Sequence, residues 1–185
     1  GTIKACMPVL DVLSCGYTLR LPVDLMVRRN KENEYEFLWS ADNPLDTWIE
    51  HHPIEQVKAN FFTSRQLGSS VYKIIYPFMI GTPKGYSCLF LPPVYRDNKI
   101  EILQGVVCTD EYPVVNFPFF INTDEDEFIL KAETPFAQVI PFRRENWQMS
   151  VEEDVENVWI KKLQKLKIKI ADRYGSLFRS KVKYR

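Results

Sequence analysis

KIIYPFMIGTPKGYSCLFLPP, from Lys73 to Pro93, is the stretch that decides the fold of this chain. Aromatic and β-branched residues fill the first part, Lys73 to Ile80, and such residues favour strands. The next five residues, Gly81 to Gly85, have turn chemistry, and a second apolar run follows from Tyr86 to Leu91. Apolar runs separated by turn residues in this way predict strands.

The same alternation of apolar runs and short polar connections continues to Phe142. Further strands are predicted at Ile100 to Val107, Val114 to Ile121, Phe128 to Lys131 and Phe136 to Phe142. Parallel strands would need crossover helices, and the connections here are too short to contain them. The sequence therefore predicts a mainly β fold, an antiparallel barrel or sandwich, with its core between Lys73 and Phe142.

The residues before this core also contain strand patterns. Apolar and polar residues alternate from Cys15 to Val27, where Pro22 predicts a bend or an edge position. Tyr35 to Trp39 is predicted to be its hairpin partner. The pattern then weakens, and we expect a loop with a short helix near Leu45 to His51.

The periodicity changes to that of a helix after Trp147. Ser150 and Glu153 have the spacing of a capping box, which predicts a helix start at Ser150. Apolar residues then recur every three or four positions up to Tyr174, and Gly175 is the expected stop. The predicted organisation is a β-rich part, residues 1–149, with a C-terminal amphipathic helix and basic tail, residues 150–185, packed on it as a single domain.

The composition is that of a folded, water-soluble chain. Of the 185 residues, 45% are hydrophobic and 26% are charged, a balance unlike that of disordered proteins. The longest apolar runs fall short of the ~20 residues that span a bilayer, so no membrane partner is expected. The four cysteines contain no CxxC pair and are expected to be reduced thiols. A cytoplasmic location follows from these expectations.

The net charge is zero, but the charges are unevenly distributed. Residues 161–185 contain ten lysines and arginines against Asp172 alone, a net charge of +9. The remainder contains 14 basic and 23 acidic residues, a net charge of −9. The basic segment is compatible with nucleic-acid binding, with Tyr174, Phe178 and Tyr184 available to stack on bases. A solvated helix face, or a helix that pairs with a second copy, is the competing interpretation.

Familiar catalytic motifs are absent from the sequence. It contains no GxSxG, P-loop, GxGxxG or HExxH pattern. The only histidines, His51 and His52, are adjacent and point in different directions on a strand or a helix, so no metal site is predicted there. The acidic run Asn122 to Glu127 lacks the glycine and terminal glutamate of an EF-hand, and we interpret it as a solvated loop.

Several longer motifs resemble a domain-of-unknown-function family of marine phages and bacteria, to which no activity is assigned. They are Lys4 to Pro8, Thr82 to Phe90, Gly105 to Tyr112, Thr134 to Gln138 and Pro141 to Trp147. This resemblance implies a protein of phage derivation, located in the host cytoplasm if it is phage-encoded.

The order of these motifs is also similar to the dUTPase and dCTP deaminase superfamily. In that superfamily a small-residue-Gly-Tyr start, here Ser14 to Tyr17, precedes a phosphate-binding turn, here Pro83 to Gly85. A Gly-Val-Ile-Asp-x-x-Tyr hairpin follows, here Gly105 to Tyr112, and then a strand that ends in Ala-Gln, here Ala137-Gln138. The resemblance implies a β-clip fold, a trimer, a nucleotide ligand and Mg²⁺ as cofactor.

The chain departs from that superfamily at the residues that perform its chemistry. Cys108 stands where the family has a catalytic aspartate, and a thiol is not the carboxylate base that the role needs. Asp110 lies two residues further on, would point to the same face of a strand, and is a candidate replacement. The phosphate-binding turn has Lys84 but lacks the arginine and the serine of the family.

The leading hypothesis is therefore a non-catalytic binding or assembly module with no cofactor, which forms a homo-oligomer. Its predicted ligand-binding groove contains Lys84, Gly85, Tyr86, Asp110, Tyr112 and Gln138. One alternative is a nucleotide-processing enzyme of the dNTP pyrophosphatase or deaminase type, with Mg²⁺ and with Asp110 as base. The other alternative is a nucleic-acid-binding protein that uses the basic C-terminal helix.

Overall fold

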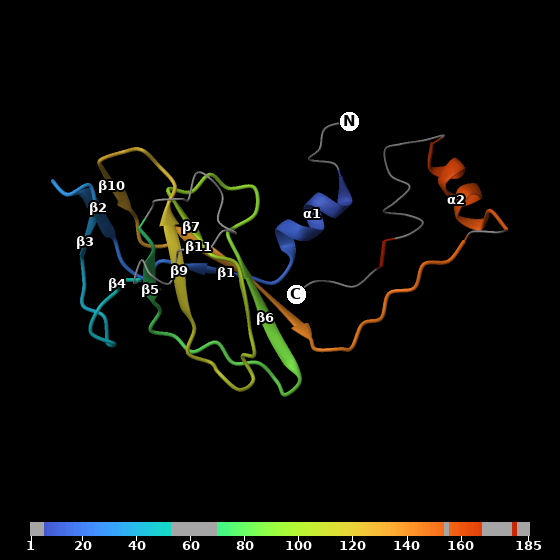
Figure 1. The fold of residues 1–185 in the computed structure, drawn as a ribbon, viewed down its shortest axis with the longest axis horizontal. Helices are drawn as coiled ribbons and strands as arrows, with labels where there is room; N and C mark the ends of the chain where they lie inside the picture. The colour runs from blue at the N-terminus through green and yellow to red at the C-terminus, as the bar shows by residue number, and fades with distance from the viewer. Residues whose placement is uncertain (1–5, 53–69, 154–155, 168–178, 181–185) are drawn as a thin grey trace. The chain divides into compact units, whose positions relative to one another are not determined.

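The computed structural model describes residues 6–52, 70–153, 156–167 and 179–180, and the chain divides into two compact units (Figure 1). Unit 1 comprises residues 1–15 and 145–185, and unit 2 comprises residues 16–144. The boundary predicted at residue 150 lies a few residues beyond the end of unit 2. The first fifteen residues group with the C-terminal segment rather than with the strands.

Unit 2 contains all the strands of the described residues, and every pairing between them is antiparallel. The strands are β1 (Tyr17–Arg20), β2 (Leu25–Arg29), β3 (Tyr35–Trp39), β4 (Ile49–His51), β5 (Tyr72–Ile75), β6 (Tyr86–Leu91), β7 (Ile100–Ile102), β8 (Gly105–Val107), β9 (Asn116–Ile121), β10 (Glu127–Leu130) and β11 (Pro135–Arg143). The prediction of a mainly β, antiparallel fold is confirmed.

The strands form three sheets that do not close into a barrel. Their orders are β1-β11-β6-β8, β10-β2-β3 and β4-β5-β9-β7, an arrangement consistent with a sandwich. Two stretches predicted as single strands are each divided between sheets. Pro22 lies between β1 and β2, and Leu103-Gln104 lies between β7 and β8. A change of sheet at these points lets both halves turn an apolar face toward one core.

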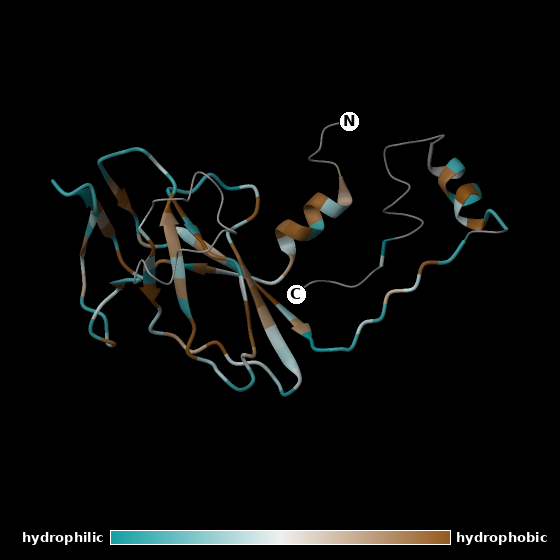
Figure 2. Cartoon of the chain, in the orientation of Figure 1, coloured by the Kyte–Doolittle hydropathy of each residue, from teal (hydrophilic) through white to brown (hydrophobic). Residues whose placement is uncertain are grey.

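The core is built around aromatic side chains at alternate strand positions. Phe136 of β11 packs edge-to-face on Phe117 of β9, with 5.2 Å between ring centroids, and on Tyr76, at 5.5 Å. Phe117 also contacts Phe90 of β6 at 5.4 Å. In Figure 2 hydrophobic residues colour parts of the strands of unit 2, and also parts of α1 and α2. Edge-to-face aromatic contacts of this kind stabilise a core beyond the area that they bury.

Unit 1 contains two short helices, α1 (Met7–Ser14) and α2 (Val158–Lys167). Helix α1 was not predicted, and Pro8 in its first turn is a favourable helix-start residue. Between β11 and α2, residues 145–153 form neither helix nor strand, and we call this segment the arm (Figure 1). Among the described residues, no helix has the length and apolar character needed to cross a membrane.

Two predicted helix positions are wrong. The helix expected near Leu45 to His51 is replaced by β4, in which Ile49 pairs with Ile74 of β5. The predicted helix start at Ser150 is also wrong, because α2 begins at Val158. A capping pair contributes little when no tertiary contact buries the first turn, and Val151 in that turn is exposed. The predicted continuation to Tyr174 and the stop at Gly175 lie outside the described residues.

Candidate functional site

Two turns of unit 2 meet where the sequence predicted a ligand-binding groove. The first precedes β6 and contains Lys84 and Gly85, and the second follows β8 and contains Asp110. The backbone amide of Gly85 donates a hydrogen bond of 2.8 Å to Oδ2 of Asp110. Gly85 has a φ of 87°, a conformation that glycine adopts at little cost. Two of the predicted residues, Gly85 and Asp110, are thus in direct contact, beside Tyr86, the first residue of β6.

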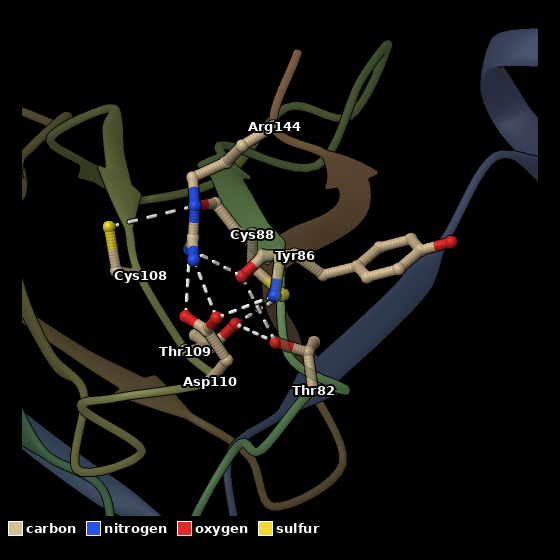
Figure 3. Close-up of polar contacts among 9 residues, drawn as sticks. Thr82, Tyr86, Cys88, Cys108, Thr109, Asp110 and Arg144 are labelled. Atoms are coloured by element: carbon tan, nitrogen blue, oxygen red, sulfur yellow. Dashed lines mark hydrogen bonds and ion pairs between the residues drawn. The ribbon is translucent and has the colours of Figure 1, made fainter.

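Arg144, which the sequence did not single out, joins this group from the end of β11 (Figure 3). Its guanidinium binds both carboxylate oxygens of Asp110, with Nη1–Oδ1 at 2.7 Å and Nη2–Oδ2 at 2.5 Å. Nη1 also donates to the carbonyl oxygen of Tyr86 at 2.8 Å and to Ser87 Oγ at 3.1 Å. We call Gly85, Asp110 and Arg144 the clamp, because together they tie the end of β11 to both turns.

The clamp fixes the ionisation of its carboxylate. The Asp110 side chain is only 3% exposed, whereas that of Arg144 is 35% exposed. The hydrogen bonds from Arg144, and then that from the Gly85 amide, lower the pKa of Asp110 to about 2. The same ion pair raises the pKa of Arg144. A carboxylate stabilised in this way is a weak proton acceptor at neutral pH, so Asp110 is poorly suited to act as a general base.

The clamp predicts a specific acid sensitivity. The folded-state pKa of Asp110, about 2, lies below its ordinary value of 3.8, so the carboxylate stabilises the fold above about pH 4. This contribution is expected to be lost as the pH falls from about 4 through 2. Urea unfolding between pH 7 and pH 2 measures it. Asp110→Asn is expected to be less stable at pH 7 and to lose less stability on acidification; parallel curves for the two proteins would contradict this prediction.

Cys108 lies close to the clamp but does not interact with Asp110 in the way that a catalytic pair would. It is exposed, and the hydroxyl of Ser87 contacts its sulfur at 3.7 Å. The next residue, Thr109, is buried and hydrogen-bonds with Thr82 at 2.8 Å and donates to the Cys88 sulfur at 3.4 Å. Thr109 therefore anchors the turn, and this anchoring positions Asp110 for Arg144.

The remaining predicted site residues are not part of this group. Lys84 and Tyr112 are exposed, and Tyr112 has 59% of its surface accessible. Gln138 is buried within β11, where its Oε1 accepts a hydrogen bond of 3.4 Å from the Val94 amide. The step from Gln138 to Arg144 along this strand corresponds to about 20 Å. The predicted groove from Asp110 to Gln138 is thus not formed by one cluster of side chains.

The start motif and the Ala-Gln strand of the dUTPase-like resemblance do meet. Tyr17 pairs with Val139, and Thr18 pairs with Gln138, where β1 lies beside β11. Gly16 has a φ of 73° and approaches the backbone of Val139 so closely that a Cβ atom would lie 2.0 Å from its carbonyl oxygen. A glycine is therefore required at this position for a local, structural reason.

A surface depression of about 540 Å³ lies at the tip of the β2–β3 hairpin. Its lining residues are Arg28, Arg29, Asn30, Lys31, Glu32 and Glu36. Arg28 pairs with Glu36 at 3.2 Å, and Arg29 pairs with Asp126 at 3.2 Å. These carboxylates offset the two guanidiniums, so the depression is not the strongly positive site that an anionic ligand would need. In the described part of the chain, no group of three or more His, Cys, Asp or Glu side chains is arranged to hold a metal ion.

Comparisons with protein-family models, with curated proteins and with solved structures each return no match to this chain.

Proposed function

We propose that this protein is a non-catalytic binding and assembly module, and that the arm is the segment through which it binds another protein. The observation that carries the proposal is the exposure of three apolar side chains in the arm. Trp147 is 85% exposed, Met149 is 92% exposed and Val151 is 90% exposed. Large apolar groups grouped on a surface commonly mark a protein interaction site, whereas single exposed ones are ordinary.

The spacing of these side chains supports the proposal. They occur at every second residue, and in an extended chain such residues project to the same side. The residues between them, Gln148 and Ser150, are polar and would project to the other side of an extended arm. An extended peptide that reads a partner surface through alternate side chains is a recurrent mode of protein recognition.

The area of these side chains sets the scale of the interaction. Complete burial of one tryptophan, one methionine and one valine contributes roughly 7–12 kcal/mol before any cost is subtracted. Association costs about 4–15 kcal/mol in lost freedom, so a floppy arm would bind weakly. The clamp fixes Arg144 at the point where the arm begins, so the arm starts from a defined position on unit 2.

The nucleotide-processing alternative receives less support from the site. It requires Asp110 as general base, and that carboxylate is occupied by Arg144 and the Gly85 amide. Cys108 does not supply the missing carboxylate. The nucleic-acid alternative depends largely on Tyr174, Phe178 and Tyr184 and on the basic residues beyond α2, most of which lie outside the described residues.

Site-specific photocrosslinking tests the proposal, because it captures a protein partner of any sequence. A benzophenone amino acid at position 147 of the full chain is expected to crosslink to protein efficiently, because this side chain would be buried in the complex. The same group at position 148 projects to the other side of the arm and is expected to crosslink far less. Equal yields at both positions, or no adduct from position 147, would remove the basis for the proposed function.

A further inference from the structure

The sheet β10-β2-β3 has an apolar stripe on the face that points away from the core. Ile129, Met26 and Leu38 lie directly opposite one another in the three strands. Ile129 is 48% exposed, Leu38 is 57% exposed, and Met26 between them is partly buried. Their strand neighbours Val27 and Phe128 are buried in the core. The register of the sheet, rather than chance exposure, therefore groups the three apolar side chains.

Charged pairs border the stripe on both sides of this outer face. Two positions along the strands, Arg28 pairs with Glu36 at 3.2 Å. On the opposite side, Lys131 pairs with Asp24 at 3.0 Å. An apolar centre with a polar rim is the composition of protein–protein interfaces. The stripe is consequently a candidate receptor for an apolar peptide.

The arm of the same molecule is too short to place Trp147 on its own stripe. The arm begins after Arg144, which the clamp holds at the end of β11. Figure 1 shows β2, β3 and β10 at the other end of unit 2 from the arrowhead of β11. The length of β11, nine residues, gives the scale of unit 2 in this direction: the strand alone extends for about 27 Å. Three residues from Arg144 to Trp147 reach at most about 11 Å.

We infer that the stripe binds the arm of a second copy of this chain. This inference rests on the proposed function and adds to it the identity of the partner and the surface that receives the arm. The dimensions agree: Trp147 to Val151 extends for about 13 Å in an extended arm, and the stripe crosses three strands, about 10 Å. One chain thus carries both an apolar arm and an apolar stripe that could receive it. Trp147 of the arm cannot reach the stripe of its own molecule.

The position of the two surfaces determines the kind of assembly. The arm and the stripe belong to different parts of the chain, so each contact joins two different surfaces. Such a heterologous contact repeats from one copy to the next, and it either closes into a ring or continues as a filament. The small area of arm and stripe makes each contact weak, so assembly depends on protein concentration.

Sedimentation velocity of the full chain over a wide range of concentrations tests the inference. The wild-type chain is expected to assemble as its concentration rises. Trp147→Ser in the arm and Leu38→Lys in the stripe are each expected to weaken assembly by at least about tenfold, as loss of an interface hot spot does. Ile129→Lys repeats the stripe test from a different strand. Val106→Lys is the matched control, because Val106 is similarly exposed, on β8 of another sheet.

Mixing the two variants gives the decisive result. Trp147→Ser retains an intact stripe and Leu38→Lys retains an intact arm, so a mixture is expected to form dimers that grow no further. A wild-type chain that stays monomeric, stripe variants that assemble normally, or a mixture without dimers would each overturn the inference. Crosslinking from position 147 to a different protein, unchanged by Leu38→Lys, would overturn it while leaving the proposed function intact.

Discussion

Replacement of Phe136 by alanine is expected to lower the free energy of unfolding by about 3–5 kcal/mol, a large part of the 5–15 kcal/mol typical of a domain. Phe136 is 1% exposed and contacts the rings of Tyr76 and Phe117. Alanine removes these edge-to-face contacts and leaves a cavity that the surrounding rigid sheets cannot fill completely. The loss therefore includes both the transfer of the ring and the cavity.

The matched control for Phe136 lies on the same strand. Phe142 also belongs to β11 but is 39% exposed, so Phe142→Ala is expected to lower the free energy of unfolding by less than about 1 kcal/mol. Urea denaturation followed by circular dichroism measures both variants. Similar losses for the two phenylalanines would show that Phe136 is not at the centre of the core.

A destabilised β11 would also weaken the function that we propose. This strand ends at the residue before the one that the clamp holds, and the arm follows directly. If Phe136→Ala loosens the strand, the arm starts from a less fixed position and assembly is expected to decline even under conditions where the protein remains folded. The core and the proposed interaction segment are thus linked through one strand.

The strands were predictable because their information is local. The run from Tyr86 to Leu91 matches β6 at both ends, since its apolar residues are bounded by a glycine turn and by two prolines. The division of Ile100 to Val107 between β7 and β8 was not predictable, because the change of sheet depends on distant partners. Ile100 pairs with Ile121, whereas Val107 pairs with Cys88.

The candidate site was predicted only in part, for the same reason. Gly85 and Asp110 were placed in one predicted groove through the resemblance to the dUTPase superfamily, and the two residues do meet. Arg144 is 34 residues from Asp110, and no local pattern indicates that the two side chains meet. Their ion pair nevertheless lowers the pKa of Asp110 and makes this carboxylate a weak proton acceptor. The exposed arm was likewise obscured by a capping signal at Ser150 that favours a helix in isolation.

Substitution of Gly16 is expected to have the second large effect on stability, because both its backbone conformation and the space around it require glycine. Gly16→Ala is expected to lower the free energy of unfolding by about 2–5 kcal/mol, the sum of a left-handed backbone and an overpacked contact. Its φ is 73°, and an added Cβ would lie 2.0 Å from the carbonyl oxygen of Val139. Backbone atoms cannot move aside as a flexible side chain can, so β1 and β11 would have to separate.

Two other glycines allow the effect of backbone conformation to be measured apart from the effect of close packing. Gly85 has a φ of 87° but open space around its Cβ position, so Gly85→Ala is expected to cost only the backbone term, about 1–2 kcal/mol. Gly105 has neither constraint, and Gly105→Ala is expected to be neutral or to stabilise slightly, since alanine restricts the unfolded chain. Thermal or urea unfolding of the three variants should rank them Gly16, Gly85, Gly105 in order of decreasing loss. A Gly16 variant no worse than the Gly85 variant would mean that the close approach of β1 to β11 is not maintained in solution.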